Sequence, residues 1–174
     1  MSAEDSETCT IRPATPDDCA LIAELVHELA DYERLADQAQ ATADDFRRHL
    51  FGEHSSAEAA IVEVNAHPVG FALWFTTFST FLGRAGLYLE DIYVRPPYRG
   101  RGIGKGLLAM LAQLAIDRGC GRLEWSVLNW NTPAIGFYEA MGARPVGEWT
   151  VYRLTGEPLR LLAEAGSLEP EARS

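Results

Sequence analysis

One segment constrains this chain more than any other: residues 99–106 read Arg-Gly-Arg-Gly-Ile-Gly-Lys-Gly. The segment follows a predicted strand at 86–94 and precedes apolar residues with helical spacing at 103–114. Glycine lets the backbone approach a ligand closely, and the N–H groups at a helix N-terminus bind anionic phosphate oxygens. The segment therefore predicts a cradle for a pyrophosphate group.

Other interpretations of this segment fit less well. A Walker A loop requires Ser or Thr where the chain has Gly106, and a glycine where it has Arg99. A dinucleotide-binding fingerprint requires a third glycine where the chain has Lys105. A flexible turn without a ligand is the remaining alternative. Four glycines and three basic residues in an acidic chain favour a bound anion instead.

The rest of the chain predicts an α+β fold. Strands are predicted at 8–12, 59–64, 69–78, 86–94, 123–128 and 149–154, with a hairpin turn at 65–68. Helices are predicted to begin near Asp17, Thr42, Ile103 and Pro133, and a further helix lies in the acidic tail. This order predicts a mixed central β-sheet flanked by helices. We expect a single domain over 8–166, with disordered tails at 1–7 and 167–174.

The composition argues against several classes of partner. Fifteen Lys and Arg against 25 Asp and Glu give a formal net charge of -10, which disfavours nucleic acid and anionic membranes. This charge favours cationic ligands, although many proteins are acidic for solubility alone. The three cysteines and four histidines lack the spacing of disulfide frameworks or metal sites, so no metal is expected. No targeting or membrane-spanning segment is recognised, which favours a cytoplasmic protein.

The glycine-rich turn resembles the acyl-CoA-binding motif of the GNAT acetyltransferases, Arg/Gln-x-x-Gly-x-Gly/Ala, through Arg99, Gly102 and Gly104. The preceding strand and residues 129–143 are also similar to that superfamily. Four further segments are similar to its diamine (spermidine/spermine) and thialysine acetyltransferase branch: 11–19, 28–33, 51–54 and 88–91. The resemblance implies the GNAT acyl-CoA N-acyltransferase fold, acetyl-CoA as co-substrate, a small-molecule amine as acceptor and a homodimer.

Two residues are the candidate catalytic groups. Attack on a thioester requires a neutral amine, whereas a free alkylamine with a pKa of about 10.4 is protonated at neutral pH. Glu90 is the candidate base, because strand alternation puts its carboxylate on one face with Tyr88 and Ile92 and puts Asp91 on the other. A solvent-exposed Glu90 is the alternative. The resemblance implies Tyr138 as the general acid for the leaving thiolate.

The resemblance also implies two sets of binding residues. The cofactor would contact the strand before the turn, the turn itself and the start of the later helix, which together supply Ile92, Tyr93, Val94, Arg99, Gly100, Arg101, Gly102, Ile103, Gly104, Lys105, Asn131, Thr132, Pro133 and Ala134. The amine would contact the end of the first helix and two strands, through Tyr32, Glu33, Glu90, Glu124, Trp125 and Ser126. Asn131 also fits a helix cap, and Glu33 also fits a solvated helix face. Asn129 stands where the branch is expected to have an acidic residue, which puts a strict polyamine substrate in doubt.

Three functions follow from these patterns. The first is acetylation of a primary amine on a polyamine, diamine or lysine-like molecule, by direct attack in a ternary complex. The second is acetylation of protein lysines or N-termini. The third is a non-catalytic acyl-CoA-binding module, against which the presence of both Glu90 and Tyr138 argues.

Overall fold

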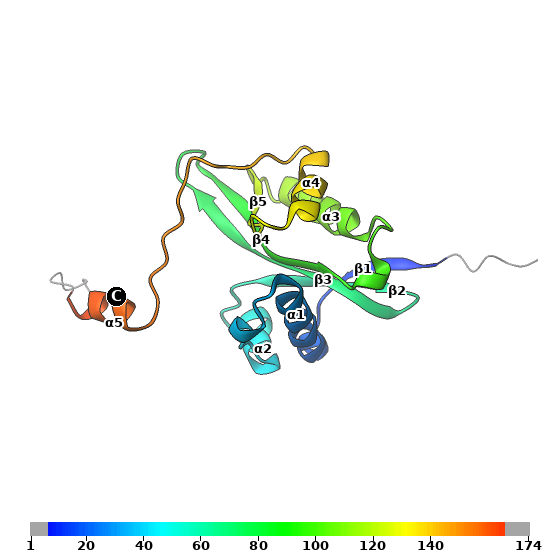
Figure 1. The fold of residues 1–174 in the computed structure, drawn as a ribbon, viewed down its shortest axis with the longest axis horizontal. Coiled ribbons are helices and arrows are strands. Elements are labelled where there is room, and N and C mark those ends of the chain that lie inside the picture. The colour runs from blue at the N-terminus through cyan, green and yellow to red at the C-terminus, as the bar shows by residue number, and fades with distance from the viewer. Residues whose placement is uncertain (1–6, 166–174) are drawn as a thin grey trace, which may run out of the picture. The chain divides into compact units, whose positions relative to one another are not determined.

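A five-stranded sheet in the order β1-β2-β3-β4-β5 forms the frame of the fold (Figure 1). The computed structural model describes residues 7–165. The strands are β1 (Cys9–Pro13), β2 (Glu58–Val64), β3 (His67–Ser79), β4 (Arg84–Val94) and β5 (Leu123–Trp125). The first four strands pair antiparallel in sequence order, whereas β5 pairs parallel with β4. The predicted mixed sheet is confirmed.

The helices lie on both faces of this sheet. Helices α1 (Cys19–Glu33) and α2 (Ala43–Phe51) cover one face, and α3 (Ile103–Asp117) covers the other (Figure 1). Because β4 and β5 run parallel, the chain must cross between their ends, and α3 makes that crossover. Short 3-10 turns lie at Pro16–Asp18, Ala36–Gln38 and Pro96–Tyr98.

The chain divides into two compact units between Trp130 and Asn131. The first unit holds the sheet with α1, α2 and α3, and the second holds α4 (Thr132–Ala140) and α5 (Gly156–Glu164). The single domain expected over 8–166 stays a prediction. The tails 1–7 and 167–174 were expected to be disordered, and residues 1–6 and 167–174 lie outside the described residues. Glu7, the last residue of the first tail, forms an ion pair with Arg101.

The β2–β3 hairpin turn is shorter than predicted. Only Asn65 and Ala66 connect the strands, and both have positive φ angles, of 51° and 63°. Two left-handed residues in succession make the turn whose twist matches that of the flanking strands. His67 and Pro68, which were predicted to belong to the turn, therefore lie in β3.

The prediction of a final strand at 149–154 is wrong. These residues have no regular secondary structure, and the side chains of Trp149 and Tyr152 are 72% and 92% exposed. Apolar alternation favours a strand only where a neighbouring edge satisfies the backbone N–H and C=O groups. Residues 149–154 pair with no strand among the described residues. β5 is also shorter than predicted, since it ends at Trp125.

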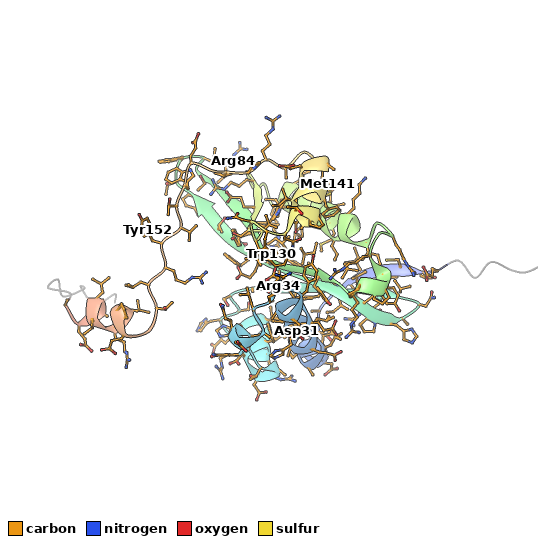
Figure 2. All side chains as sticks on the ribbon, in the orientation of Figure 1. Asp31, Arg34, Arg84, Trp130, Met141 and Tyr152 are labelled. Carbon is orange, nitrogen blue, oxygen red and sulfur yellow. The ribbon has the colours of Figure 1, made fainter. Side chains whose placement is uncertain are left out.

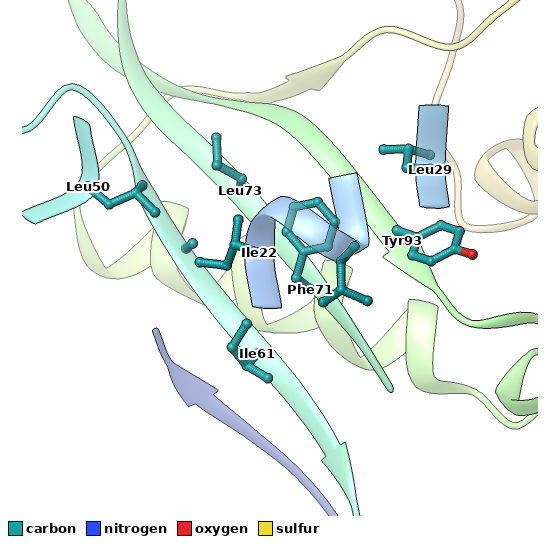
Figure 3. Packing of buried hydrophobic residues seen from close by; sticks show 9 residues of the cluster. Ile22, Leu29, Leu50, Ile61, Phe71, Leu73 and Tyr93 are labelled. Atoms are coloured by element: carbon teal, nitrogen blue, oxygen red, sulfur yellow. The ribbon is translucent and has the colours of Figure 1, made fainter. Parts of the chain in front are cut away.

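The core on the α1 side of the sheet holds β4 in place. Nine buried residues make this cluster (Figure 3): Ile22, Leu25, Leu29, Leu50, Ala59, Ile61, Phe71, Leu73 and Tyr93. Its α1 members have the predicted helical spacing, which confirms the apolar face of that helix. Because Tyr93 belongs both to this core and to β4, core packing positions the strand that carries Glu90 and Asp91.

Candidate active site

The glycine-rich turn runs into α3, which begins at Ile103. Gly100 and Gly102 have left-handed φ angles of 76° and 80°, and no atom lies within 4 Å of a Cβ built on either residue. The first intrahelical bond runs from the Gly106 N–H to the Gly102 carbonyl oxygen at 2.9 Å, so the N–H groups before it have no carbonyl partner inside the helix. The open backbone and these N–H groups fit an anionic phosphate.

The three basic residues of the turn lie in different surroundings. Arg99 donates from Nε to the carbonyl oxygen of Val94 at 2.7 Å. Arg101 pairs with Glu7 at 2.8 Å. Lys105 is exposed and has no ion pair among the residues that the structure describes. The side chain of Lys105 is therefore the basic group of the turn with no protein partner competing for an anion.

A β-bulge interrupts β4 at Glu90. Asp91 lies opposite Leu73 of β3, whereas Leu89 lies opposite Trp74, which leaves Glu90 with no residue opposite it. Such an extra residue is unpaired and bends its strand. The Glu90 side chain is exposed as a result.

The bulge changes the face on which each β4 side chain lies. Cross-strand partners share a face, so Asp91 lies on the α1 face together with Tyr88 and Tyr93. Ile92 lies on the opposite, α3 face. The predicted arrangement, with Glu90 sharing a face with both Tyr88 and Ile92 and Asp91 opposite them, is wrong. Simple alternation assumes two residues per repeat, and one inserted residue reverses every face beyond it.

Asp91 is a partly buried carboxyl group, whereas the neighbouring Glu90 is exposed. Burial, followed by the charges of Glu90 and Glu33, raises the pKa of Asp91 from 3.8 to about 6. Burial likewise raises the pKa of Glu33, at the end of α1. Three carboxyl groups from two elements therefore act on one another here, and we call Glu33, Glu90 and Asp91 the acidic cluster. A cluster of this kind attracts a cation and holds a proton near neutral pH.

A row of cationic and aromatic side chains lies beside the acidic cluster. The Arg99 guanidinium is 4.5 Å from the ring centroid of Tyr32 and 5.4 Å from that of Tyr93. The Tyr32 ring lies 6.4 Å from that of Trp130, and the Arg34 guanidinium is 5.1 Å from the Trp130 ring. Cation–π contacts of this length contribute about 0.5–2 kcal/mol each. We call these five side chains the cation–aromatic row; it connects the end of α1 with the glycine-rich turn.

Ion pairs anchor the middle of α1 to the end of β4. The Arg95 guanidinium contacts the Glu28 carboxylate at 2.7 Å, and it also pairs with Glu24. Burial, followed by the charge of Glu28, raises the pKa of Tyr93. This anchor holds the helix end with Tyr32 and Glu33 against the strand that carries Asp91.

The predicted residues of β5 make separate contacts. Glu124 pairs with Arg122 at 2.7 Å, and the Ser126 and Tyr88 hydroxyl oxygens are 2.6 Å apart. Trp125 lies opposite Leu89, which is the last β4 residue paired with β5. Residues 90–94 therefore continue along β4 without a partner in β5, so backbone groups of the predicted cofactor contacts at 92–94 lie on an unpaired stretch of the strand edge.

The second unit carries the other predicted residues. The buried Asn131 side chain accepts a hydrogen bond from the Ala134 N–H at 3.4 Å, which confirms the predicted helix cap. Pro133 lies in the first turn of α4, where its missing N–H leaves no helical bond unmade. Tyr138 lies on α4, with its ring 5.4 Å from that of Phe137. The cofactor contacts of this helix and the role of Tyr138 stay predictions.

Sequence reasoning missed three contributors to this region. It treated Asp91 as a weaker candidate because a β-bulge leaves no clear signal in a strand pattern. It also missed Arg34 and Trp130, which lie far apart in the chain but make a ring contact. The end of α1 at Glu33 makes Arg34 its C-cap. The sequence gives no signal for the ring that the Arg34 guanidinium contacts.

Comparison with known proteins identifies the family. Residues 22–143 match the acetyltransferase (GNAT) family. This chain belongs to the GNAT acetyltransferases. It is 40% identical over 164 residues to a thialysine N-epsilon-acetyltransferase of Bos taurus, which covers 88% of this chain and 96% of the bovine protein. It is 32% identical over 197 residues to an L-ornithine N5-acetyltransferase of Arabidopsis thaliana, covering 87% and 86% of the two chains.

A solved structure with a similar fold agrees with the family match. An integron cassette protein from the mobile metagenome of V. cholerae superposes with a TM-score of 0.76 at 30% identity, over 90% of this chain and 98% of the other. The expected GNAT fold is thereby confirmed. GNAT enzymes use acetyl-CoA as co-substrate, and the open glycine-rich turn at the start of α3 fits its pyrophosphate. Within residues 7–165, none of the helices has the length and apolar character needed to cross a bilayer, and no His, Cys, Asp and Glu side chains group as metal ligands would.

Proposed function

We propose that this GNAT enzyme transfers the acetyl group of acetyl-CoA to a terminal primary amine of a small molecule, a diamine or a lysine-like compound. The acidic cluster beside aromatic rings is the observation that carries this proposal, because carboxylates and ring faces together bind alkylammonium groups. Relatives named for thialysine and for L-ornithine acetylation support it, since both compounds carry a terminal amine.

The proposed acetyl-CoA site uses the glycine-rich turn and the unpaired stretch of β4. Backbone N–H groups at the start of α3 bind the pyrophosphate, and Lys105 adds a positive charge. Backbone N–H groups of 92–94 stabilise the thioester oxygen as negative charge develops on it. Asn131 and the first turn of α4 contact the pantetheine arm, in line with the family resemblance.

The proposed chemistry is direct transfer in a ternary complex. The amine nitrogen forms a bond to the carbonyl carbon while the bond from that carbon to sulfur breaks. The amine proton passes to a carboxylate of the acidic cluster, and Tyr138 donates a hydrogen bond or a proton to the leaving thiolate. Asp91 is the proposed proton acceptor, because its pKa of about 6 lies close to neutral pH. The exposed Glu90, the base expected from the sequence, is then a second charge that holds the ammonium group.

We propose that the protein acts as a homodimer. Apolar side chains of 146–162 are largely exposed, with Trp149 at 72% and Val151 at 87%. Association with another chain would cover exposed apolar side chains of this kind, and a second copy of the chain is the proposed partner. Light scattering on the eluting protein is expected to give twice the chain mass, and Trp149→Glu is expected to give the mass of one chain. A wild-type protein that elutes with the mass of one chain at micromolar concentration would contradict the dimer.

A cytoplasmic location belongs to the same proposal. Cys9, Cys19 and Cys120 are all free thiols, which a reducing compartment maintains. Fractionation of the source cells, with an antibody to the protein, tests this location. Recovery with secreted proteins would contradict it.

A panel of acceptors tests the proposed function. Purified protein and acetyl-CoA are combined with putrescine, spermidine, thialysine, lysine, ornithine and a lysine-bearing peptide, and released thiol is measured. At least one free small amine is expected to turn over with a kcat/KM above that of the peptide. Turnover of the peptide alone would favour a protein acetyltransferase. Calorimetric binding of acetyl-CoA without turnover of any acceptor would favour an acyl-CoA-binding module.

A further inference from the structure

Arg34 occupies a backbone position that favours glycine. It caps the C-terminus of α1 with φ 62° and ψ 34°, which is the left-handed conformation. The Leu35 N–H donates to the Ala30 carbonyl oxygen at 2.8 Å across this cap. Glycine adopts this conformation without strain, whereas a residue with a Cβ does not. Strained backbone conformations of this kind occur often at functional sites, so the contacts of the Arg34 side chain are a candidate for a function.

The Arg34 guanidinium lies on an aromatic ring and has no carboxylate partner among the described residues. Its contact is with Trp130, at 5.1 Å, and Figure 2 labels the two residues near the end of α1. Other arginines of the first unit, such as Arg95 and Arg118, form ion pairs with glutamates. A guanidinium presents a planar set of N–H donors that fits a carboxylate. The N–H groups of Arg34 are accessible to such a group from a ligand.

Opposite charges meet at the end of α1, because Glu33 of the acidic cluster is the residue immediately before Arg34 in the chain. The Arg34 guanidinium lies on the Trp130 ring, and that ring is 6.4 Å from the ring of Tyr32. Both rings are partly exposed, at 46% for Trp130 and 38% for Tyr32. An acceptor that carries both an ammonium group and a carboxylate complements these neighbouring charges.

A polyamine does not complement these two opposite charges. Its second ammonium group would meet the positive charge of Arg34 instead of a carboxylate, and like charges at such a contact disfavour the wrong ligand. The absence of an acidic residue at Asn129, where the polyamine branch is expected to have one, agrees with this reasoning.

We propose that Arg34 binds the α-carboxylate of the acceptor, so that the acceptor is an amino acid with a terminal amine and not a diamine or polyamine. This assignment rests on the proposed function, because it concerns the far end of a substrate whose terminal amine is acetylated. Arg34 is then a specificity-determining residue that takes no part in proton transfer.

Pairs of acceptors that differ only in the carboxylate test this assignment. Lysine is compared with cadaverine, and ornithine with putrescine, at saturating acetyl-CoA. The wild-type protein is expected to prefer the amino acid of each pair. Arg34→Gln is expected to lower kcat/KM for the amino acids roughly 10- to 100-fold, mainly through KM, because a hydrogen-bonded charge pair is lost. The same variant is expected to leave the diamines unchanged or improved, and Arg34→Lys to retain part of the preference.

Two further variants separate recognition from folding. Arg47→Gln removes an exposed arginine of α2 that has no ion pair among the described residues, and it is expected to change neither acceptor. Arg34→Gly relieves the left-handed cap, so it is expected to fold at least as well as wild type while losing the preference for amino acids. Equal losses for lysine and cadaverine in Arg34→Gln, or a wild-type preference for the diamines, would overturn the carboxylate assignment alone. A wild-type protein that acetylates none of the four acceptors would overturn the proposed function itself.

Discussion

Replacing Asp91 with asparagine is expected to stabilise the protein at pH 8 while lowering kcat/KM for the amine roughly a hundredfold. Asparagine preserves the shape of the side chain but carries no charge, so it removes the cost of ionising a partly buried carboxyl group. A shift in pKa from 3.8 to about 6 corresponds to about 3 kcal/mol. The rate falls because the variant has no carboxylate at Asp91 to accept the proton of the amine.

The gain in stability has a defined pH range. Burial and neighbouring charges raise the pKa of Asp91 in the folded protein, so the folded state binds this proton more tightly than the unfolded state does. Wild-type stability therefore falls as pH rises from about 4 to about 6, and the full cost applies above that range. Urea unfolding is expected to show a gain for Asp91→Asn of about 3 kcal/mol at pH 8 and almost none at pH 4.

The rate should depend on pH for the same reason. With Asp91 as proton acceptor, wild-type kcat/KM is expected to decrease below pH 6, and Asp91→Asn should lose this limb of the profile. Asp31→Asn, on the exposed side of α1, is the matched control and should change neither stability nor rate appreciably. An equal gain in stability at pH 4 and pH 8, or an unchanged rate in Asp91→Asn, would show that Asp91 does not have this role.

Replacing Tyr138 with phenylalanine is expected to lower the rate of acetyl transfer by about 10²–10⁴-fold. The variant lacks the phenol that donates to the leaving thiolate, so its effect falls on the chemical step and not on amine binding. The ring contact with Phe137 needs no hydroxyl group and is retained in the variant. Single-turnover measurements at saturating amine isolate this step from product release.

Tyr152→Phe is the matched control for Tyr138→Phe. The Tyr152 side chain is 92% exposed and belongs to the same unit of the chain, so loss of its hydroxyl group should leave the rate unchanged. A Tyr138→Phe protein that transfers acetyl at the wild-type rate would assign protonation of the thiolate to another group or to water. A loss shared equally by both variants would indicate a general effect on the second unit.

Local signals in the sequence were sufficient for much of the fold. The glycine-rich turn followed by apolar residues at helical spacing predicted α3 and its N-terminus, because both depend on residues within a few positions of one another. The cap of α4 at Asn131 followed from the same kind of local chemistry. The strand expected at 149–154 failed because pairing depends on a neighbouring edge that a sequence window does not contain.

The candidate site divides in the same way. The sequence by itself indicated the candidate groups: Glu90 on a strand, Tyr138 on a short helix and a turn that fits phosphate. Only the tertiary structure decided that Asp91 is less exposed than Glu90, because the β-bulge at Glu90 is set by the pairing of β4 with β3. It also decided that Arg34 contacts Trp130, since the two residues meet only when α1 packs on the sheet. The pKa of Asp91 and the ring contact of Arg34 depend on these long-range contacts, which no local pattern encodes.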